Sequence, residues 1–326
     1  LLHLSISPIL SSHIEHGAQV PLMRCRWTLL SGNYNMSIIN NANPGSGLIL
    51  LPLIERVLQS AQEPLSQDTL LARYRPDNLP ANDNAWRKLK ENLSFWCNLG
   101  LWPMLDGKML PLEAGVRPLA HRLLICTIDA CREKGVASGN DCEPLWRVLS
   151  CLLSLQQHSV GGREPLSPTI ITNKVHKWLP GETINSNTEK LVREFGRFLG
   201  FLELMPDGNY VTDPTRAIQY FLPEIFDDTH TLPAKIFMAN MAEVMPMMDG
   251  GQYRNSVHDV MQQEKDWIAP EGDNICTSTS VALQRLEISR RIILSIHSDD
   301  KDALSLHLPG GKIRRVSQIT LREDAE

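Results

Sequence analysis

The sequence predicts a mostly α protein with small β-hairpins, which is an α+β chain. Apolar residues recur at steps of three and four in several segments, and this is the period of an amphipathic helix. Two segments about one hundred residues apart resemble each other: LGLWPMLDGKMLPL begins at Leu99, and LGFLELMPDGNYVTD begins at Leu199. Each follows a helical segment and contains an Asp-Gly dipeptide, which suits a tight hairpin because both residues tolerate a positive φ. The chain therefore repeats a unit of helices followed by a hairpin.

Composition and charge exclude several classes of protein. The chain has 326 residues, enough for two or three domains, and 42% of them are hydrophobic and 21% charged. This hydrophobic fraction argues against a disordered chain. No run of about eighteen apolar residues occurs, so a membrane span is not expected either. The net charge of -5 argues against nonspecific coating of nucleic acid, so any nucleic-acid contact must be local.

The seven cysteines indicate a reducing compartment. They are scattered, odd in number and form no C-x-x-C pair. This fits intracellular thiols better than a disulfide framework or a zinc ribbon. We therefore expect a cytoplasmic protein.

Residues 1–35 differ from the rest of the chain. They show neither a helical period nor a sustained alternation, whereas MSIINNANPGSG from Met36 reads like a natural start. A secretory signal is the alternative, but Arg24 and Arg26 lie late in the segment and no long apolar region with a cleavage site follows them. We expect residues 1–35 to be a disordered or non-native leader that adds nothing to the core.

Residues 46–115 form the first predicted unit. SGLILLPLIERVLQ indicates a helix that breaks at Glu63-Pro64, and a short helix capped by Ser66 follows and stops before Pro76. AWRKLKENLSFWCNLG then places an apolar face on a longer helix, and the Asp106-Gly107 hairpin comes after it. Residues 116–160 are expected to be a helical connector.

The second predicted unit spans residues 166–226. Its helix NTEKLVREFGRFLG is expected to begin at Asn187 as N-cap and to end near Gly200, and the Asp207-Gly208 hairpin follows. Pro180-Gly181 separates this helix from the one before it.

The third predicted unit spans residues 230–322 and has an extended wing. Three helices, KIFMANMAEVMP, QYRNSVHDVMQQ and CTSTSVALQRLEISRR, are followed by alternating strands around polar turns. In the last helix, Ser278 or Thr279 is expected as N-cap, and the apolar set is Val281, Leu283, Leu286 and Ile288.

Helix, short helix, longer helix and hairpin is the order of a winged helix-turn-helix unit. With this order and its two Asp-Gly hairpins, the chain resembles tandem winged helix-turn-helix proteins of bacterial DNA metabolism over most of residues 46–321. In its length from Met36 and its MSIINN start, it also resembles the DpdG accessory proteins of bacterial clusters that insert 7-deazaguanine derivatives into DNA. The second resemblance implies a role in DNA modification or in restriction of unmodified DNA.

Polar and basic residues on the third helix of each unit predict contacts with DNA. In a DNA-binding winged helix this helix enters the major groove, where Asn reads adenine and Arg or Lys meets guanine or phosphate. An ordinary solvated helix face is the competing interpretation, because charged residues populate nearly every exposed face. The candidate DNA-binding residues are Asn84, Arg87, Lys88, Asn187, Lys190, Arg193, Ser280, Gln284, Arg285, Lys312, Arg314 and Arg315.

The third unit carries the densest basic cluster of the three. We expect Arg285, Arg314 and Arg315 to lie on one exposed face and to neutralise phosphates. Ser280 and Gln284 are the expected base readers.

No enzyme constellation stands out in the sequence. The chain lacks G-x-x-x-x-G-K-[ST], G-x-G-x-x-G after a strand, H-E-x-x-H and G-x-S-x-G. The cluster His13–His16 is expected to be a chance arrangement rather than a metal site. Cys126 and Cys131 are expected to be core thiols rather than redox partners. We therefore expect no catalytic activity, no cofactor and no metal.

The first hypothesis is a non-catalytic DNA-binding accessory protein. Its expected partners are double-stranded DNA and other proteins of a DNA-modification or defence cluster. The alternative is a protein-interaction scaffold that uses winged helices as docking modules, and the acidic total charge keeps this alternative open. An enzyme on an unfamiliar fold ranks third.

Overall fold

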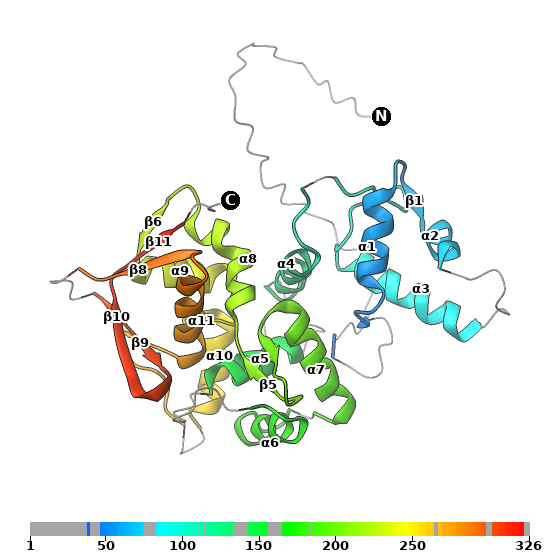
Figure 1. The fold of residues 1–326 in the computed structure, drawn as a ribbon. Coiled ribbons are helices and arrows are strands. Elements are labelled where there is room, and N and C mark those ends of the chain that lie inside the picture. The colour runs from blue at the N-terminus through cyan, green and yellow to red at the C-terminus, as the bar shows by residue number, and fades with distance from the viewer. Residues whose placement is uncertain are drawn as a thin grey trace, which may run out of the picture. The chain divides into compact units, whose positions relative to one another are not determined.

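The computed structural model is mostly helical, with short strands between the helices (Figure 1). It describes residues 38–39, 46–74, 83–113, 115–132, 143–155, 165–182, 184–263, 267–297 and 302–322. The mostly α, α+β class predicted from the sequence is confirmed. The expected leader, the start at Met36 and the His13–His16 cluster lie outside the described residues.

The first copy of the repeated unit runs from residue 51 to residue 109. Ser66 begins the second helix as expected, because its Oγ accepts a hydrogen bond from the Thr69 backbone N at 3.0 Å. The third helix ends before Gly100, whose φ is 78°. The elements are α1 (Leu51–Ser60), β1 (Leu65–Ser66), α2 (Gln67–Arg73), α3 (Asp83–Asn98), β2 (Met104–Leu105) and β3 (Lys108–Met109).

The predicted hairpin of this copy is confirmed, and the structure adds a third strand to it. Asp106 and Gly107 form the turn with φ angles of 50° and 73°, and β2 pairs antiparallel with β3. β1 also pairs with β3, which gives the sheet order β1-β3-β2.

The second copy has the same order of elements but begins earlier than expected. Its helices and strands are α5 (Glu143–Ser154), α6 (Pro168–Trp178), α7 (Ser186–Leu199), β4 (Leu202–Leu204) and β5 (Tyr210–Thr212). A single antiparallel bridge joins Leu166 to Tyr210, in the place that the pairing of β1 with β3 occupies in the first copy. The helix α5, which we expected in the connector, therefore stands at the position of α1.

Local signals around the second hairpin were mostly correct. Gly200 caps the C-terminus of α7 with a φ of 89°, and β4 and β5 are antiparallel on either side of the Asp207-Gly208 turn. The expected N-cap Asn187 is wrong by two residues. Asn185 is the N-cap, since its Oδ1 accepts from the backbone N of Asn187 and of Thr188 at 3.0 Å each.

The C-terminal region departs from the expected single wing. Its strands form two sheets, β6-β11-β8 and β10-β9-β7, so the strand that leaves the last helix pairs with the end of the chain and not with β9. All neighbouring strands are antiparallel except β7 and β9. The elements are β6 (Thr231–Pro233), α9 (Ala234–Val244), α10 (Gln252–Met261), β7 (Asn274–Ile275), α11 (Thr277–Ile288), β8 (Ile292–Ser295), β9 (Leu304–Leu308), β10 (Lys312–Val316) and β11 (Gln318–Leu321).

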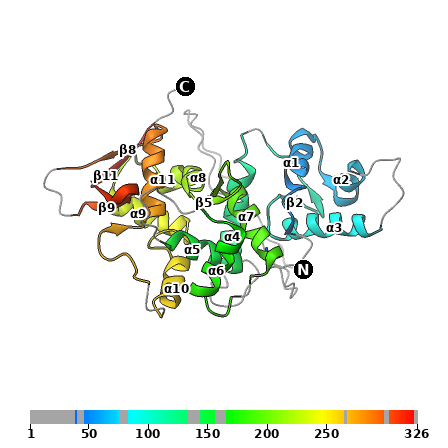
Figure 2. The same cartoon turned by 60° about the horizontal axis from the view of Figure 1, so that its bottom comes forward.

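Two further helices, α4 (Leu119–Arg132) and α8 (Thr215–Phe226), complete the fold. α4 packs against both α7 and α8, and α11 packs against α8. α5 lies beside α6 and α10 (Figure 2). Buried apolar side chains form one continuous core, which Ile38 and Ile39 join although the sequence suggested only a polar lead there. Among the described helices, none has the length and apolar composition required to cross a membrane.

Candidate functional site

The N-terminal half of α3 presents the first group of predicted DNA-binding residues to solvent. Asn84, Arg87 and Lys88 are all exposed and lie at steps of three and four, so they share one face of the helix. The opposite face anchors the helix, because Leu93 and Trp96 are fully buried in the core. The sequence prediction of an amphipathic α3 is therefore confirmed, and its polar face is accessible.

The positive charge on this face is largely unneutralised. Among the residues that the structure describes, Arg87 pairs with Glu91 at 3.9 Å, and the Arg87 side chain remains 67% exposed. Exposed pairs of this kind contribute little, so Arg87 remains able to exchange partners. Among the described residues, Lys88, Lys90 and Lys108 have no ion-pair partner, and all three are exposed. Lys108 lies directly after the hairpin turn and was not among the residues predicted from the sequence. Its position after Asp106-Gly107 could have indicated a basic residue at the hairpin tip.

A buried polar contact holds the base of the first hairpin. Trp102 Nε1 donates to Glu55 Oε2 at 3.1 Å, and the Arg122 guanidinium forms an ion pair with the same carboxylate. Arg122 Nη1 also donates to the Leu101 carbonyl at 3.1 Å. Since Glu55 belongs to α1 and Arg122 to α4, these bonds fix the orientation of the hairpin relative to two helices.

The equivalent helix of the second copy, α7, differs in how its charges are paired. Arg193 donates two hydrogen bonds to the buried Glu189, which raises the pKa of Arg193, and its guanidinium lies 5.4 Å from the Tyr210 ring centroid. Lys190 has Glu194 at 3.8 Å. Asn187 is exposed. The second group of predicted residues is thus partly neutralised by its own helix.

The second hairpin is attached to α11. Arg285 forms ion pairs with Glu203 in β4, at 2.8 Å, and with the fully buried carboxylate of Asp213. Arg285 therefore joins the hairpin of the second copy to the C-terminal region.

The expected position of Ser280 on a solvent face is wrong. Its side chain is fully buried, donates to the Ile275 carbonyl at 3.3 Å and accepts from the His307 backbone N at 2.9 Å. Gln284 is half-buried. α11 begins at Thr277 with Cys276 as its N-cap, and its first seven residues are all buried. The cause is that α11 packs against α8, β8, β9 and α5.

The expectation that Arg285, Arg314 and Arg315 share one exposed face is also wrong. Arg314 and Arg315 are neighbours in β10, so their side chains point to opposite faces of the sheet. Arg314 binds the Glu287 carboxylate, and this hydrogen bond lowers the pKa of Glu287. Arg315 is exposed and donates to the Ala303 carbonyl at 3.2 Å, and Lys312 is exposed.

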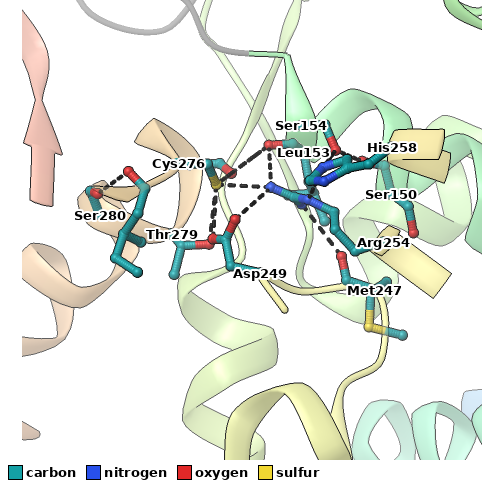
Figure 3. A network of polar contacts seen from close by, with 12 residues as sticks. Ser150, Leu153, Ser154, Met247, Asp249, Arg254, His258, Cys276, Thr279 and Ser280 are labelled. Carbon is teal, nitrogen blue, oxygen red and sulfur yellow. Dashed lines mark hydrogen bonds and ion pairs between the residues drawn. The ribbon is translucent and has the colours of Figure 1, made fainter. Parts of the chain in front are cut away.

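A second polar site lies inside the protein, around Arg254 in α10 (Figure 3). This arginine is fully buried and was not singled out from the sequence. Its Nη2 contacts Asp249 Oδ1 at 3.1 Å, Cys276 Sγ at 2.9 Å and the carbonyl of Leu153 at 3.1 Å. These contacts join the end of α5, the turn before α10 and the start of α11.

The protonation states in this network indicate a structural role. Burial raises the pKa of the Cys276 thiol, so the sulfur is protonated at neutral pH and is a poor nucleophile. Burial lowers the pKa of His258 to about 4, and the neutral ring accepts a hydrogen bond from Arg254 Nε at 3.2 Å. Within the described part of the chain, no group of three or more His, Cys, Asp or Glu side chains is placed to hold a metal ion.

Fold and surface together define a class: a mostly α, α+β protein with two related helix-and-hairpin copies, one of which presents an accessible basic helix face. Comparison with protein families gives a match to the model described as DpdG-like, over residues 36–300. The chain belongs to the DpdG-like family. This confirms the resemblance to DpdG accessory proteins, whereas the winged-helix resemblance stays a prediction. Neither the curated proteins nor the solved structures contain a match to this chain.

Proposed function

We propose that the chain is a non-catalytic, DNA-binding accessory protein that works with the enzymes of a DNA-modification cluster. Membership of the DpdG-like family supports the accessory role in such a cluster. In this proposal residues 51–109 are a winged helix-turn-helix unit, and α3 is its recognition helix. The element order and the pairing of β1, β3 and β2 support this assignment.

The observation that carries the proposal is the open basic face of α3. Arg87 and Lys88 are exposed there beside Asn84, at the N-terminal end of the helix. In helix-turn-helix proteins the N-terminal residues of the recognition helix contact the base edges. Lys108 adds a positive charge on the hairpin. In a winged helix this hairpin, the wing, contacts the DNA backbone. A local basic surface of this kind is compatible with the net charge of -5 for the whole chain.

The test compares equal charge losses on the two equivalent helices. The variant Arg87→Ala/Lys88→Ala should weaken binding to a duplex at about 50 mM salt. It should also flatten the dependence of log affinity on log salt, by roughly 0.9 for each of the two side chains that meets a phosphate rather than a base edge. The matched control Lys190→Ala/Arg197→Ala removes the same charge from α7 and should leave both quantities nearly unchanged.

Two outcomes contradict the proposal in different ways. Equal losses in both double variants would show that binding is spread over the surface and is not specific to α3. No binding of the unmutated protein at about 50 mM salt, where electrostatic contacts are strongest, would reject DNA binding and leave the protein-interaction scaffold as the better hypothesis.

A further inference from the structure

Each hairpin carries an exposed leucine at the end of its first strand, but the two leucines have different surroundings. Leu105 is the last residue of β2 and is 59% exposed, and Leu204 is the last residue of β4 and is 44% exposed. We propose that Leu105 is an apolar wedge that the first hairpin inserts between stacked base pairs of duplex DNA. This inference rests on the proposed function, because it requires that the first copy binds DNA.

The turn geometry places Leu105 at the very tip of its hairpin. Leu105 lies directly opposite Lys108, so only Asp106 and Gly107 extend beyond it, and both have positive φ. In the second hairpin, residues 205–209 separate Leu204 from its partner Tyr210. A longer loop therefore stands in front of Leu204 and keeps it back from any surface that the hairpin approaches.

Charge also distinguishes the two tips. At the first tip Lys108 offsets Asp106, and it is placed to meet a phosphate next to the leucine. The second loop carries Asp207 and has no cation within residues 205–209. Hydrogen bonds from Asn209 lower the pKa of Asp207, so this carboxylate stays charged and repels phosphate.

A wedge has to be held rigidly, and buried contacts hold the base of the first hairpin in place. Trp102 is 1% exposed and bonded to Glu55, which in turn binds Arg122 of α4. Proteins that kink DNA insert single side chains such as Phe, Leu or Ile between base steps, and they recover the unstacking cost through additional contacts. A protein partner is the weaker alternative, because a stable protein interface buries about 1,200–2,000 Å², and one leucine flanked by charged residues offers far less.

The experiment uses the full chain and two duplexes of one sequence. In one duplex every base pair matches, with 2-aminopurine at a central flexible pyrimidine–purine step. In the other a central mismatch has already weakened stacking. The unmutated protein should raise 2-aminopurine fluorescence on binding, because stacking quenches this base, and it should bind the mismatched duplex about tenfold more tightly.

Three variants separate the wedge from other effects. Leu105→Ala should remove both the fluorescence rise and the mismatch preference. Leu204→Ala, the matched control, should retain both. Lys108→Ala should weaken binding to both duplexes and flatten the salt dependence by roughly 0.9, while the mismatch preference persists. Circular dichroism checks that all three variants are folded.

The failures are distinguishable. Equal affinity for the two duplexes without a fluorescence rise overturns the wedge and leaves DNA binding intact. Retention of both signals in Leu105→Ala also overturns the wedge. Absence of binding by the unmutated protein to either duplex overturns the proposed function together with the wedge.

Discussion

The two helix-and-hairpin copies have the same order of elements but expose different surfaces. In residues 51–109 the outer face of α3 carries Arg87 and Lys88 in the open. In residues 143–212 Arg193 of the corresponding helix α7 is hydrogen-bonded to Glu189 of the same helix. The hairpin of this copy contacts α11 through an ion pair with Arg285. One architecture thus provides an accessible surface in the first copy and an internal contact in the second.

The difference shows that an arginine at a given place in a repeat does not by itself predict binding. What matters is whether its charge has been satisfied within the fold, since a buried or bidentate ion pair must be broken before the arginine can meet a phosphate. Family membership and element order are shared by both copies. Their ion pairs, together with the length and charge of their hairpin tips, separate them.

The largest expected effect, on the free energy of unfolding, tests whether the buried contacts of Arg254 hold the second copy to the C-terminal region. Arg254→Met leaves Asp249 without its buried ion-pair partner and removes one of the donors to the Leu153 carbonyl, which keeps the hydroxyl of Ser278. Removal of one member of a buried ion pair costs about 3–5 kcal/mol. The free energy of unfolding, measured with urea, should fall by that amount. Arg315→Met, which removes an exposed arginine, should change it by no more than about 0.5 kcal/mol.

The next effect tests the anchor of the first hairpin. Glu55→Gln removes the carboxylate that Arg122 and Trp102 share, and it should cost about 2–3 kcal/mol, because both charged partners retain some contact with solvent. DNA affinity of the folded variant should fall as well, since the hairpin loses its fixed orientation. An affinity equal to that of the unmutated protein would contradict the role of the anchor.

A smaller effect concerns Arg314, which the structure places in an ion pair. The folded-state pKa of Glu287 lies below its unfolded value, so the pair stabilises the protein above the unfolded pKa, about 4.3. This stability is lost as the pH falls through the lower, folded-state pKa. Glu287→Gln should therefore destabilise the protein by about 1 kcal/mol at pH 7, and the difference should shrink below about pH 4.3. A difference independent of pH would show that the pair does not form.

The smallest effect would make the second copy more like the first. Glu194→Gln removes the exposed carboxylate 3.8 Å from Lys190, and it should leave DNA affinity within about twofold, because the pair is weak and α7 makes no DNA contact in the proposal. Glu91→Gln is the matched change on α3, beside Arg87. A large gain from Glu194→Gln alone would mean that α7 also faces the DNA.

Local signals in the sequence predicted much of the fold. The helical period placed α3, the side chain of Ser66 marked the start of α2, and Asp106-Gly107 marked the first hairpin. Each of these depends on residues within a few positions of one another, because helix period, capping and turn geometry are properties of short backbone segments. The same reasoning was misled in α11, where Ile288 was assigned to the apolar face but is 73% exposed.

The sequence by itself determined the class of the protein, its helix-and-hairpin repeat and the basic face of α3. Tertiary structure decided which basic residues remain accessible. Arg285 finds its partners 72 and 82 residues away, and Arg254 bonds to a carbonyl 101 residues away. Such partners are chosen by packing, and desolvation determines whether a charge must be paired inside the protein or stays free for a ligand. No local pattern contains that information.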